Sequence, residues 1–370
     1  MTCIGVVIHG PAAIDSGRAR QLIEILAGIG EVRAVLGGTM GRAAVIDAGL
    51  EDVIDISKSL KPSESIQDLG AYCDVVLLVN EGKCAESGFA FGAMVFERVG
   101  SFTVPLIQVE FTPSRNGSCA LIPWNGMKKS LLTHALLDEL EKVLEARRVL
   151  PPGSRTYLEI KGDSIKREVM GVRPGEYVTI NGIVIGKALS DKVCIIARGG
   201  EIIELQGGRL KPHGIEKLEH VDLLSAIVRS GSLRTASITP RVLEHKISGY
   251  VVIIDHSAEQ TFEIAKDADM VVTVGDDTTA VAGDLLTRLG IPMIGITDGD
   301  EDGITHHIHV PPGSVIIQLA PGNDDIVGRQ VREEIFGGKG RMEIGNAGFE
   351  GVLDGVLELA GELVQKVITY

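Results

Sequence analysis

The sequence is poor in aromatic residues, poor in cysteine and short of positive charge. Aromatic side chains make up 4 % of its 370 residues, which disfavours the base-stacking surfaces that bind single-stranded nucleic acid. The five cysteines are odd in number and form no C-x-x-C pair, so we expect reduced thiols rather than a disulfide framework or a zinc ribbon. With 36 basic and 50 acidic residues, the net charge of −14 repels phosphate backbones and anionic membranes.

Long apolar runs are also lacking. No run reaches the ~18 residues that a membrane-spanning helix needs, and the N-terminal stretch Cys3–Ile8 is too short and uncharged for a secretory signal. We therefore expect a soluble, cytoplasmic protein with no membrane partner. Glycine is abundant instead: 46 of the 370 residues, about 12 %, are glycine, against a usual share of ~7 %. This abundance is typical of a chain with many tight strand-to-helix turns.

Short β-branched runs alternate with helical stretches in residues 1–148. The runs that predict strands are Ile4–Ile8, Val32–Leu36, Asp74–Val79 and Val104–Val109. Apolar residues at helical spacing predict helices over Gly17–Gly28 and Met127–Arg147. Apolar strands joined by helices indicate a parallel sheet that is covered on both faces. This part is therefore predicted to be a Rossmann-like or flavodoxin-like α/β domain.

The pattern changes after Val149–Ser154, a proline-containing segment that we take as a linker. In residues 151–218, short strands separated by turn pairs predict hairpins in a small antiparallel barrel or sandwich, which we interpret as a structural or interaction module. Residues 220–370 return to strands alternating with helices, and a helix is expected over Gly351–Val367. The predicted fold class is thus α/β, with two parallel-sheet domains separated by a small antiparallel β module.

The sharpest chemical signal is an acidic loop after the strand predicted over Pro292–Thr297. Its carboxylates, Asp298, Asp300 and Asp302, alternate along the chain. Like charges repel one another, and a bound divalent cation is the simplest reason to keep them together. Oxygen ligands favour Mg²⁺ over zinc, so we predict a magnesium site; an acidic surface loop is the alternative. A calcium EF-hand is excluded because its twelfth position is His309 rather than Glu.

About 60 residues around this loop resemble the Toprim domain of topoisomerases and primases. In that family an acidic residue follows the first strand, and a later strand ends in a D-x-D pair. Here Asp255 follows the run Val251–Ile254, and Asp298 and Asp300 form the pair. The stretch Gly283–Pro292 looks most like the catalytic subunit of type IIB topoisomerases.

This resemblance implies that Asp298 and Asp300 hold Mg²⁺, with help from Asp255 or Asp302, and that Asp255 is catalytic. The chain departs from the family in one respect, since the first acid is normally Glu and Asp255 is one methylene shorter. That difference bears on cleavage chemistry more than on metal binding. No tyrosine-bearing winged-helix segment is recognised ahead of this region, so a topoisomerase is not expected.

A second loop of the same region follows the predicted strand Met270–Val274. Gly275 and Thr278 lie between this strand and a helix, and backbone N–H groups at a helix start are suited to hold a phosphate. The alternative is that Asp276 or Asp277 simply caps the helix.

Three histidines, His306, His307 and His309, follow the acidic loop. On a strand, His307 and His309 would share a face and could join the carboxylates in a transition-metal site. Exposed strand histidines without a ligand are the alternative.

Glycine-rich loops follow the predicted strands of the first domain. Gly37, Gly38 and Arg42 lie in one loop and Lys83 in another, and neither loop matches G-x-G-x-x-G or the P-loop. Glycines with nearby cations are suited to bind a nucleotide or another phosphorylated small molecule. Tight turns alone would also explain the glycines.

The segments Gly5–Gly10, Asp15–Gly17 and Leu36–Leu50 resemble an uncharacterised protein family of methanogenic archaea, whose members carry an N-terminal domain of unknown function. The resemblance implies an archaeal cytoplasmic protein and supplies no activity.

Two functions are compatible with these features. The first is a Toprim-like protein that binds Mg²⁺ and a phosphate-containing ligand, either a nucleotide or a nucleic acid, with phosphotransfer or phosphodiesterase chemistry. The second is a non-catalytic regulatory protein of archaeal metabolism that binds a nucleotide or a protein partner. Either function is compatible with an oligomer of this chain. The net charge of −14 disfavours nucleic acid as the ligand.

Overall fold

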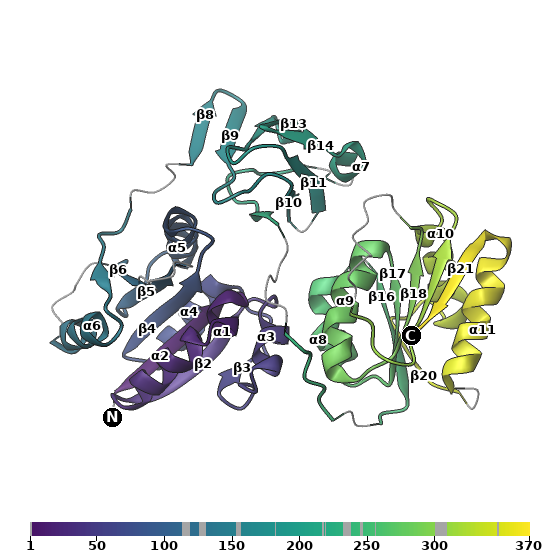
Figure 1. Ribbon diagram of the computed structural model, residues 1–370, viewed down its shortest axis with the longest axis horizontal. Coiled ribbons are helices and arrows are strands. Elements are labelled where there is room, and N and C mark those ends of the chain that lie inside the picture. Colours follow the sequence, from purple (N-terminus) through teal and green to yellow (C-terminus); the bar gives the residue numbers. More distant parts are fainter. Residues whose placement is uncertain are drawn as a thin grey trace. The chain divides into compact units, whose positions relative to one another are not determined.

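The computed structural model describes residues 2–112, 119–125, 131–152, 157–181, 183–216, 218, 220–231, 238–244, 247–255, 257–299, 309–345 and 348–370. The chain divides into two compact units (Figure 1). Met1–Gly41 and Val53–Ala236 form the first unit, and Arg42–Asp52 and Ser237–Tyr370 form the second. Within the described ranges, no helix combines the length and apolarity that crossing a membrane requires.

A seven-stranded sheet lies at the centre of the first unit, in the order β3-β2-β1-β4-β5-β6-β7. Its strands are β1 Cys3–His9, β2 Glu31–Gly37, β3 Ile54–Asp55, β4 Val75–Glu81, β5 Leu106–Phe111, β6 Cys119–Pro123 and β7 Arg147–Arg148. β1 to β5 pair in parallel, and β6 runs antiparallel to β5. The order reverses between β1 and β4, as in a doubly wound α/β sheet. The predicted α/β fold class is confirmed.

The helices of this unit follow from its apolar patterning. They are α1 Ala12–Asp15, α2 Arg18–Ala27, α4 Pro62–Gly70, α5 Ala85–Val99 and α6 Leu131–Val143. Every apolar residue of β4, Val75–Val79, is fully buried, which is expected for a strand with helices on both faces. The predicted helix over Met127–Arg147 ends earlier, because Glu145 adopts φ +49° and Arg147 pairs with β6.

The middle of the chain forms two four-stranded sheets, β14-β11-β10-β15 and β13-β12-β9-β8. Their elements are β8 Leu158–Lys161, β9 Ser164–Glu168, β10 Tyr177–Ile180, β11 Ile183–Ala188, β12 Cys194–Arg198, β13 Glu201–Gln206, β14 Gly208–Leu210, α7 Pro212–Glu216 and β15 Val228–Ser230. The strand pairs are antiparallel, as predicted. One apolar cluster that includes Val178, Ile185 and Ile195 is buried between them. We call these strands the antiparallel module.

The second unit is built on a six-stranded sheet in the order β20-β16-β17-β18-β19-β21. Its elements are β16 Tyr250–Asp255, η1 Ala258–Gln260, α8 Thr261–Ala265, β17 Met270–Val274, α9 Asp276–Leu289, β18 Met293–Thr297, β19 Val315–Leu319, α10 Asp324–Gln330, the π-helical turn η3 Val331–Ile335, β20 Arg341–Glu343, α11 Gly348–Ala360, η4 Gly361–Leu363 and β21 Val364–Thr369. β16 to β19 are parallel, and both edge strands are antiparallel. Figure 1 shows α8 and α9 on one side of the sheet and α11 on the other, with a separate apolar core under each layer.

The prediction of one helix over Gly351–Val367 is wrong at its C-terminal end. The helix α11 ends at Ala360, and Gly361 follows with φ +48°, a left-handed conformation that favours glycine and ends helices. The residues of β21 then pair antiparallel with β19. Pairing satisfies the backbone groups of the β19 edge, which a continued helix would leave open.

One short helix, α3 (Arg42–Asp47), belongs to the second unit although it lies early in the sequence. Asp47 accepts hydrogen bonds from Nε of Arg288 at 2.9 Å and from Nη2 at 2.7 Å, and both side chains are at most 2 % exposed. The buried Arg42 donates to Glu263 and lies over the ring of Phe262. Paired charges of opposite sign therefore attach this helix to α8 and α9.

Removing one charge from this buried pair should cost stability. We expect Asp47→Asn to lower the free energy of unfolding of the second unit by about 3 kcal/mol, because the Arg288 guanidinium is left without its carboxylate in a dry site. Urea unfolding measures the loss, and Asp52→Asn, at an exposed position five residues after α3, is the control. A double replacement, Asp47→Leu with Arg288→Met, should recover most of the loss. A loss from Asp47→Asn no larger than the control's would contradict this account.

Candidate functional site

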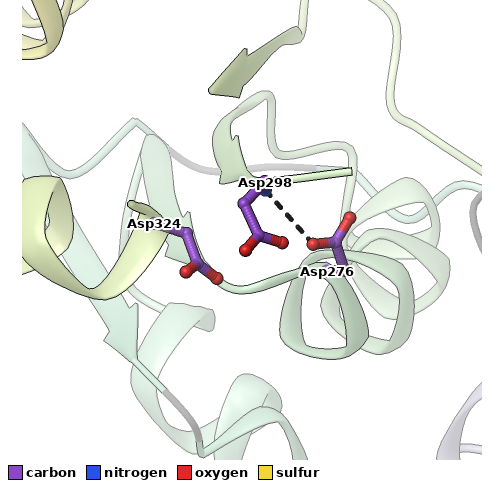
Figure 2. A group of neighbouring side chains, drawn as sticks. All are labelled: Asp276, Asp298 and Asp324. Carbon is purple, nitrogen blue, oxygen red and sulfur yellow. Dashed lines mark hydrogen bonds between the residues drawn. The ribbon is translucent and has the colours of Figure 1, made fainter. Parts of the chain in front are cut away.

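Three aspartates from different elements converge at the carboxyl edge of the second unit's sheet. Asp276 begins α9, Asp298 follows β18 and Asp324 begins α10. One carboxylate oxygen from each lies within 4.8 Å of the other two. Figure 2 shows Asp298 between the other two side chains. We call these residues the acidic triad. It forms because β17, β18 and β19 are parallel neighbours, so the loops after them begin side by side.

Backbone N–H groups fix the three carboxylates. The N–H of Asp298 donates to Oδ2 of Asp276 at 3.2 Å (Figure 2). Gly322 donates to Oδ2 of Asp298 at 2.6 Å, and Asp325 donates to Oδ1 of Asp324 at 2.9 Å. The loops thus hold the acidic triad in place while leaving further carboxylate lone pairs for another ligand.

Asp276 is partly buried beside the other two carboxyls of the acidic triad. Burial, reinforced by the neighbouring Asp298 and Asp324 carboxyls, raises the pKa of Asp276 to about 7. Its Oδ1 atom is buried and has no hydrogen-bond partner within the described part of the chain. An unsatisfied buried carboxylate oxygen is costly, and a cation placed among the three side chains would satisfy it and relieve their repulsion.

This donor set suits a hard divalent cation. Carboxylate oxygens are the ligands that Mg²⁺ and Ca²⁺ prefer, and Mg²⁺ is commonly held by one or two carboxylates together with waters and phosphate oxygens. Two helices, α9 and α10, begin at the acidic triad, and helix N-termini favour negative charge. A cation with a bound anion would therefore be accommodated better than a bare cation.

Of the residues predicted to form the metal site, the structure places Asp298 in the acidic triad and Asp255 outside it. Asp255 accepts a hydrogen bond from Nη2 of Arg332 at 3.4 Å. It ends β16, and β17 lies between β16 and β18 in the sheet, so two strand spacings, roughly 9–10 Å, separate the strands of Asp255 and Asp298. Asp300 and Asp302 lie outside the described residues.

The predicted phosphate loop lies beside the acidic triad. Gly275 precedes α9 with φ +97°, and an added Cβ there would approach Oδ2 of Asp324 at 3.9 Å. Thr278 is 5 % exposed in the first turn of α9. The alternative of an aspartate N-cap is wrong for Asp276, because the cap position is Gly275, which has no side chain.

Of the three histidines predicted as metal ligands, the structure describes only His309. Nδ1 of His309 lies 3.1 Å from Oδ1 of Asp284 on α9, and His309 is not a member of the acidic triad. His306 and His307 lie outside the described residues.

The residues predicted to bind a ligand in the first domain have different surroundings. An added Cβ at Gly37 would lie 2.7 Å from Val7, so a close approach of β1 explains that glycine. Gly38, at φ +91°, forms the turn after β2. Arg42 is buried against Glu263 in the second unit. Lys83 lines a cavity, where it pairs with Glu176.

Asp276 and Asp324 were not predicted as ligands. Asp276 was considered only as a helix cap. Asp276 lies two residues after the end of β17 and Asp324 five residues after the end of β19, so both belong to loops at the carboxyl ends of parallel strands, where ligands bind. Reading all three strand ends together would have identified the acidic triad.

Comparison with known proteins points to one family. A family described as "uncharacterized protein conserved in archaea (DUF2117)" matches residues 6–339. The protein "Uncharacterized protein MJ0065" of Methanocaldococcus jannaschii is 42 % identical over 335 residues, which cover 90 % of this chain and 91 % of that protein. No solved structure matches. The similarity is therefore not confined to an N-terminal domain.

Like-charge repulsion in the acidic triad predicts a pH-dependent effect on stability. Because the pKa of Asp276 is raised to about 7 in the folded protein, its contribution to stability is present at acidic pH and is lost as pH rises through 7. We compare the free energies of unfolding of Asp276→Asn and the wild type in the presence of a metal chelator. Between pH 5 and pH 8 this difference should shift in favour of the variant by about 1–2 kcal/mol, allowing for solvent screening. Urea unfolding at both pH values tests this; a gap that stays constant would contradict it.

Proposed function

The chain belongs to this archaeal family, and we propose that its second unit binds Mg²⁺ through the acidic triad and, through the cation, a phosphate-containing ligand. The observation that carries the proposal is the convergence of three carboxylates, one of which has a buried oxygen without a partner in the described ranges. Repulsion among these carboxylates destabilises the folded protein. A divalent cation bound among them would attract all three and offset that repulsion.

The phosphate part of the proposal rests on the surroundings of the acidic triad. Three carboxylates leave part of an octahedral Mg²⁺ shell for water or phosphate oxygens. The first turn of α9, a helix of 14 residues, begins at Asp276 after Gly275, which has φ +97°, and the N–H groups of such a turn are donors to an anion. A ligand phosphate would thus bridge the cation and the helix start.

The same geometry favours binding over phosphodiester cleavage. In the Toprim resemblance the acid at position 255 would serve as a general acid or base, which must lie within about 3 Å of the proton it transfers, directly or through one water. Asp255 is instead paired with Arg332 and separated from the acidic triad by β17. We therefore propose that the chain is a metal-dependent binding protein. Of the two functions compatible with the sequence, we prefer the regulatory protein to the phosphodiesterase.

Calorimetric titration with MgCl₂ tests the metal site. We expect wild-type protein to bind one Mg²⁺ in the second unit with a dissociation constant of about 1 mM, since few carboxylates and retained waters hold the ion. Asp298→Asn and Asp276→Asn should abolish the binding. Asp325→Asn removes the same charge next to Asp324 without touching the acidic triad, so it should leave the constant within about twofold.

The ligand and the role of Asp255 are tested in the same system. Binding of inorganic pyrophosphate should require Mg²⁺ and should be lost in Asp298→Asn. Asp255→Asn should preserve both constants, because Asp255 lies outside the acidic triad. Unchanged titrations in Asp298→Asn would overturn the proposed site. Phosphodiester turnover with Mn²⁺ that is abolished by Asp255→Asn would support Toprim-type catalysis instead.

A further inference from the structure

The first unit contains a cavity of about 760 Å³ that the proposed metal site does not use. Its floor is formed by the loops that follow β1 and β4, at His9–Pro11 and Asn80–Lys83. These are the two strands between which the sheet order reverses. In open α/β sheets, ligands bind in the crevice at this point, beyond the carboxyl ends of the strands. The volume falls in the range of small-molecule sites, ~300–1,000 Å³.

The antiparallel module completes the walls of this cavity. Arg167–Met170 contribute from β9 and the loop after it, and Ile227–Gly231 contribute from β15 and its flanks. Nζ of Lys83 donates to Oε2 of Glu176 at 2.8 Å and to the Ser230 carbonyl at 2.6 Å. These bonds close the module onto the β4 loop. The module therefore supplies part of a ligand site, which its sequence did not reveal.

The cavity is cationic although the chain is acidic. Six basic side chains line it, namely Lys61, Lys83, Arg98, Arg167, Arg173 and Arg229, against four acidic ones, Asp15, Glu81, Glu168 and Glu176. The whole chain carries a net charge of −14. Local positive potential in an acidic protein raises the concentration of anions at that place.

Among the described residues, no carboxylate compensates the charge of Arg229. Arg229 lies on β15, is half-buried, and its side chain makes no hydrogen bond or ion pair within the described part of the chain. Burial lowers the pKa of its guanidinium, so the charge is held there at a cost in stability. Arg98 and Arg167, by contrast, donate to backbone carbonyls. A guanidinium kept without an acceptor in a cavity is suited to a bidentate carboxylate or phosphate.

A buried hydrogen-bond chain below the cavity orients His9. Glu110 is fully buried and accepts from Asn80 at 2.9 Å, from Gln108 at 2.7 Å and from the Gly82 N–H at 2.8 Å. Because the Asn80 amide nitrogen donates to Glu110, its oxygen faces Nδ1 of His9 at 2.9 Å. Nδ1 therefore carries the proton, and Nε2 is left as an acceptor.

His9 also stays neutral at physiological pH. Burial and, to a smaller extent, the charge of Arg229 lower the pKa of His9 to about 4, against the opposing effect of the hydrogen bond that Nδ1 donates to Oδ1 of Asn80. The ring stacks on Phe91 with centroids 3.9 Å apart. The cavity thus offers a neutral acceptor beside a cation and an aromatic surface.

The remaining walls are apolar. Phe91 and Met94 from α5 and Val169 and Met170 from the antiparallel module line the cavity. The loop after β1 reads Gly10-Pro11-Ala12, which lacks the glycine pattern that cradles a pyrophosphate. The helix after it, α1, has only four residues. A dinucleotide is therefore disfavoured.

We propose that this cavity binds a small organic anion, whose carboxylate or phosphate pairs with Arg229 and whose apolar body packs between α5 and the antiparallel module. A hydroxyl or N–H of the ligand donates to Nε2 of His9. The site is independent of the acidic triad, which belongs to the other unit.

The anionic dye 1-anilinonaphthalene-8-sulfonate tests the site, because it combines an aromatic body with an anionic group. We expect one site per chain with micromolar affinity, observed as increased dye fluorescence. Arg229→Met should weaken binding at least tenfold, Arg229→Lys should weaken it less, and Ala90→Trp should block the cavity wall on α5. Arg198→Met, an exposed arginine of the antiparallel module outside the cavity, should bind as the wild type does.

A stability measurement separates a ligand-binding arginine from a structural one. Without ligand, Arg229→Met should raise the melting temperature by about 2–4 °C, since it removes an uncompensated charge. A structural arginine would lose stability on replacement. A lower melting temperature of Arg229→Met together with unchanged dye binding would overturn the proposal. Dye binding that survives both Arg229→Lys and Ala90→Trp unchanged would also overturn it, even if Arg229→Met failed to fold.

Competition identifies the anionic group. Displacement of the dye by AMP but not by adenosine assigns a phosphate ligand. Displacement by 1-naphthoate but not by 1-naphthalenemethanol assigns a carboxylate ligand. Displacement by none of the four overturns the assignment of a carboxylate or phosphate anion.

Discussion

Both candidate sites depend on one constraint, which is that neighbouring parallel strands end at the same edge of a sheet. In the second unit, β17, β18 and β19 place the starts of three loops side by side, and one aspartate from each forms the acidic triad. In the first unit, β1 and β4 end on either side of the point where the order reverses, and their loops form the cavity floor. Chemistry-bearing residues that are far apart in sequence become neighbours for this reason.

The two sites balance charge in opposite ways. The acidic triad concentrates negative charge, and burial with neighbouring carboxyls raises the pKa of Asp276 to about 7. The cavity keeps an uncompensated guanidinium, Arg229, in an otherwise acidic chain. Asp47 and Arg288, by contrast, are almost fully buried and pair with each other. Charge that is left without an opposite partner is more typical of binding sites than of packing.

The sequence predicted the strands better than the site residues, for physical reasons. Runs such as Val75–Val79 are apolar throughout because helices bury both faces, and that signal is local. Asp298 was found because it directly follows such a run. Arg229 could not be found, since it lies on a three-residue strand and its lack of a partner is a property of the folded chain. The pairing of β21 with β19 and the placement of α3 in the second unit also arise from long-range contacts.

The central claim is that the acidic triad is a divalent-cation site, and anomalous diffraction tests it most directly. Crystals grown with about 10 mM MnCl₂, well above the expected dissociation constant, would be measured on both sides of the manganese absorption edge. The account predicts one anomalous peak within about 2.2 Å of carboxylate oxygens of Asp276, Asp298 and Asp324. Well-ordered triad side chains with no peak among them, or a peak only elsewhere in the chain, would contradict it.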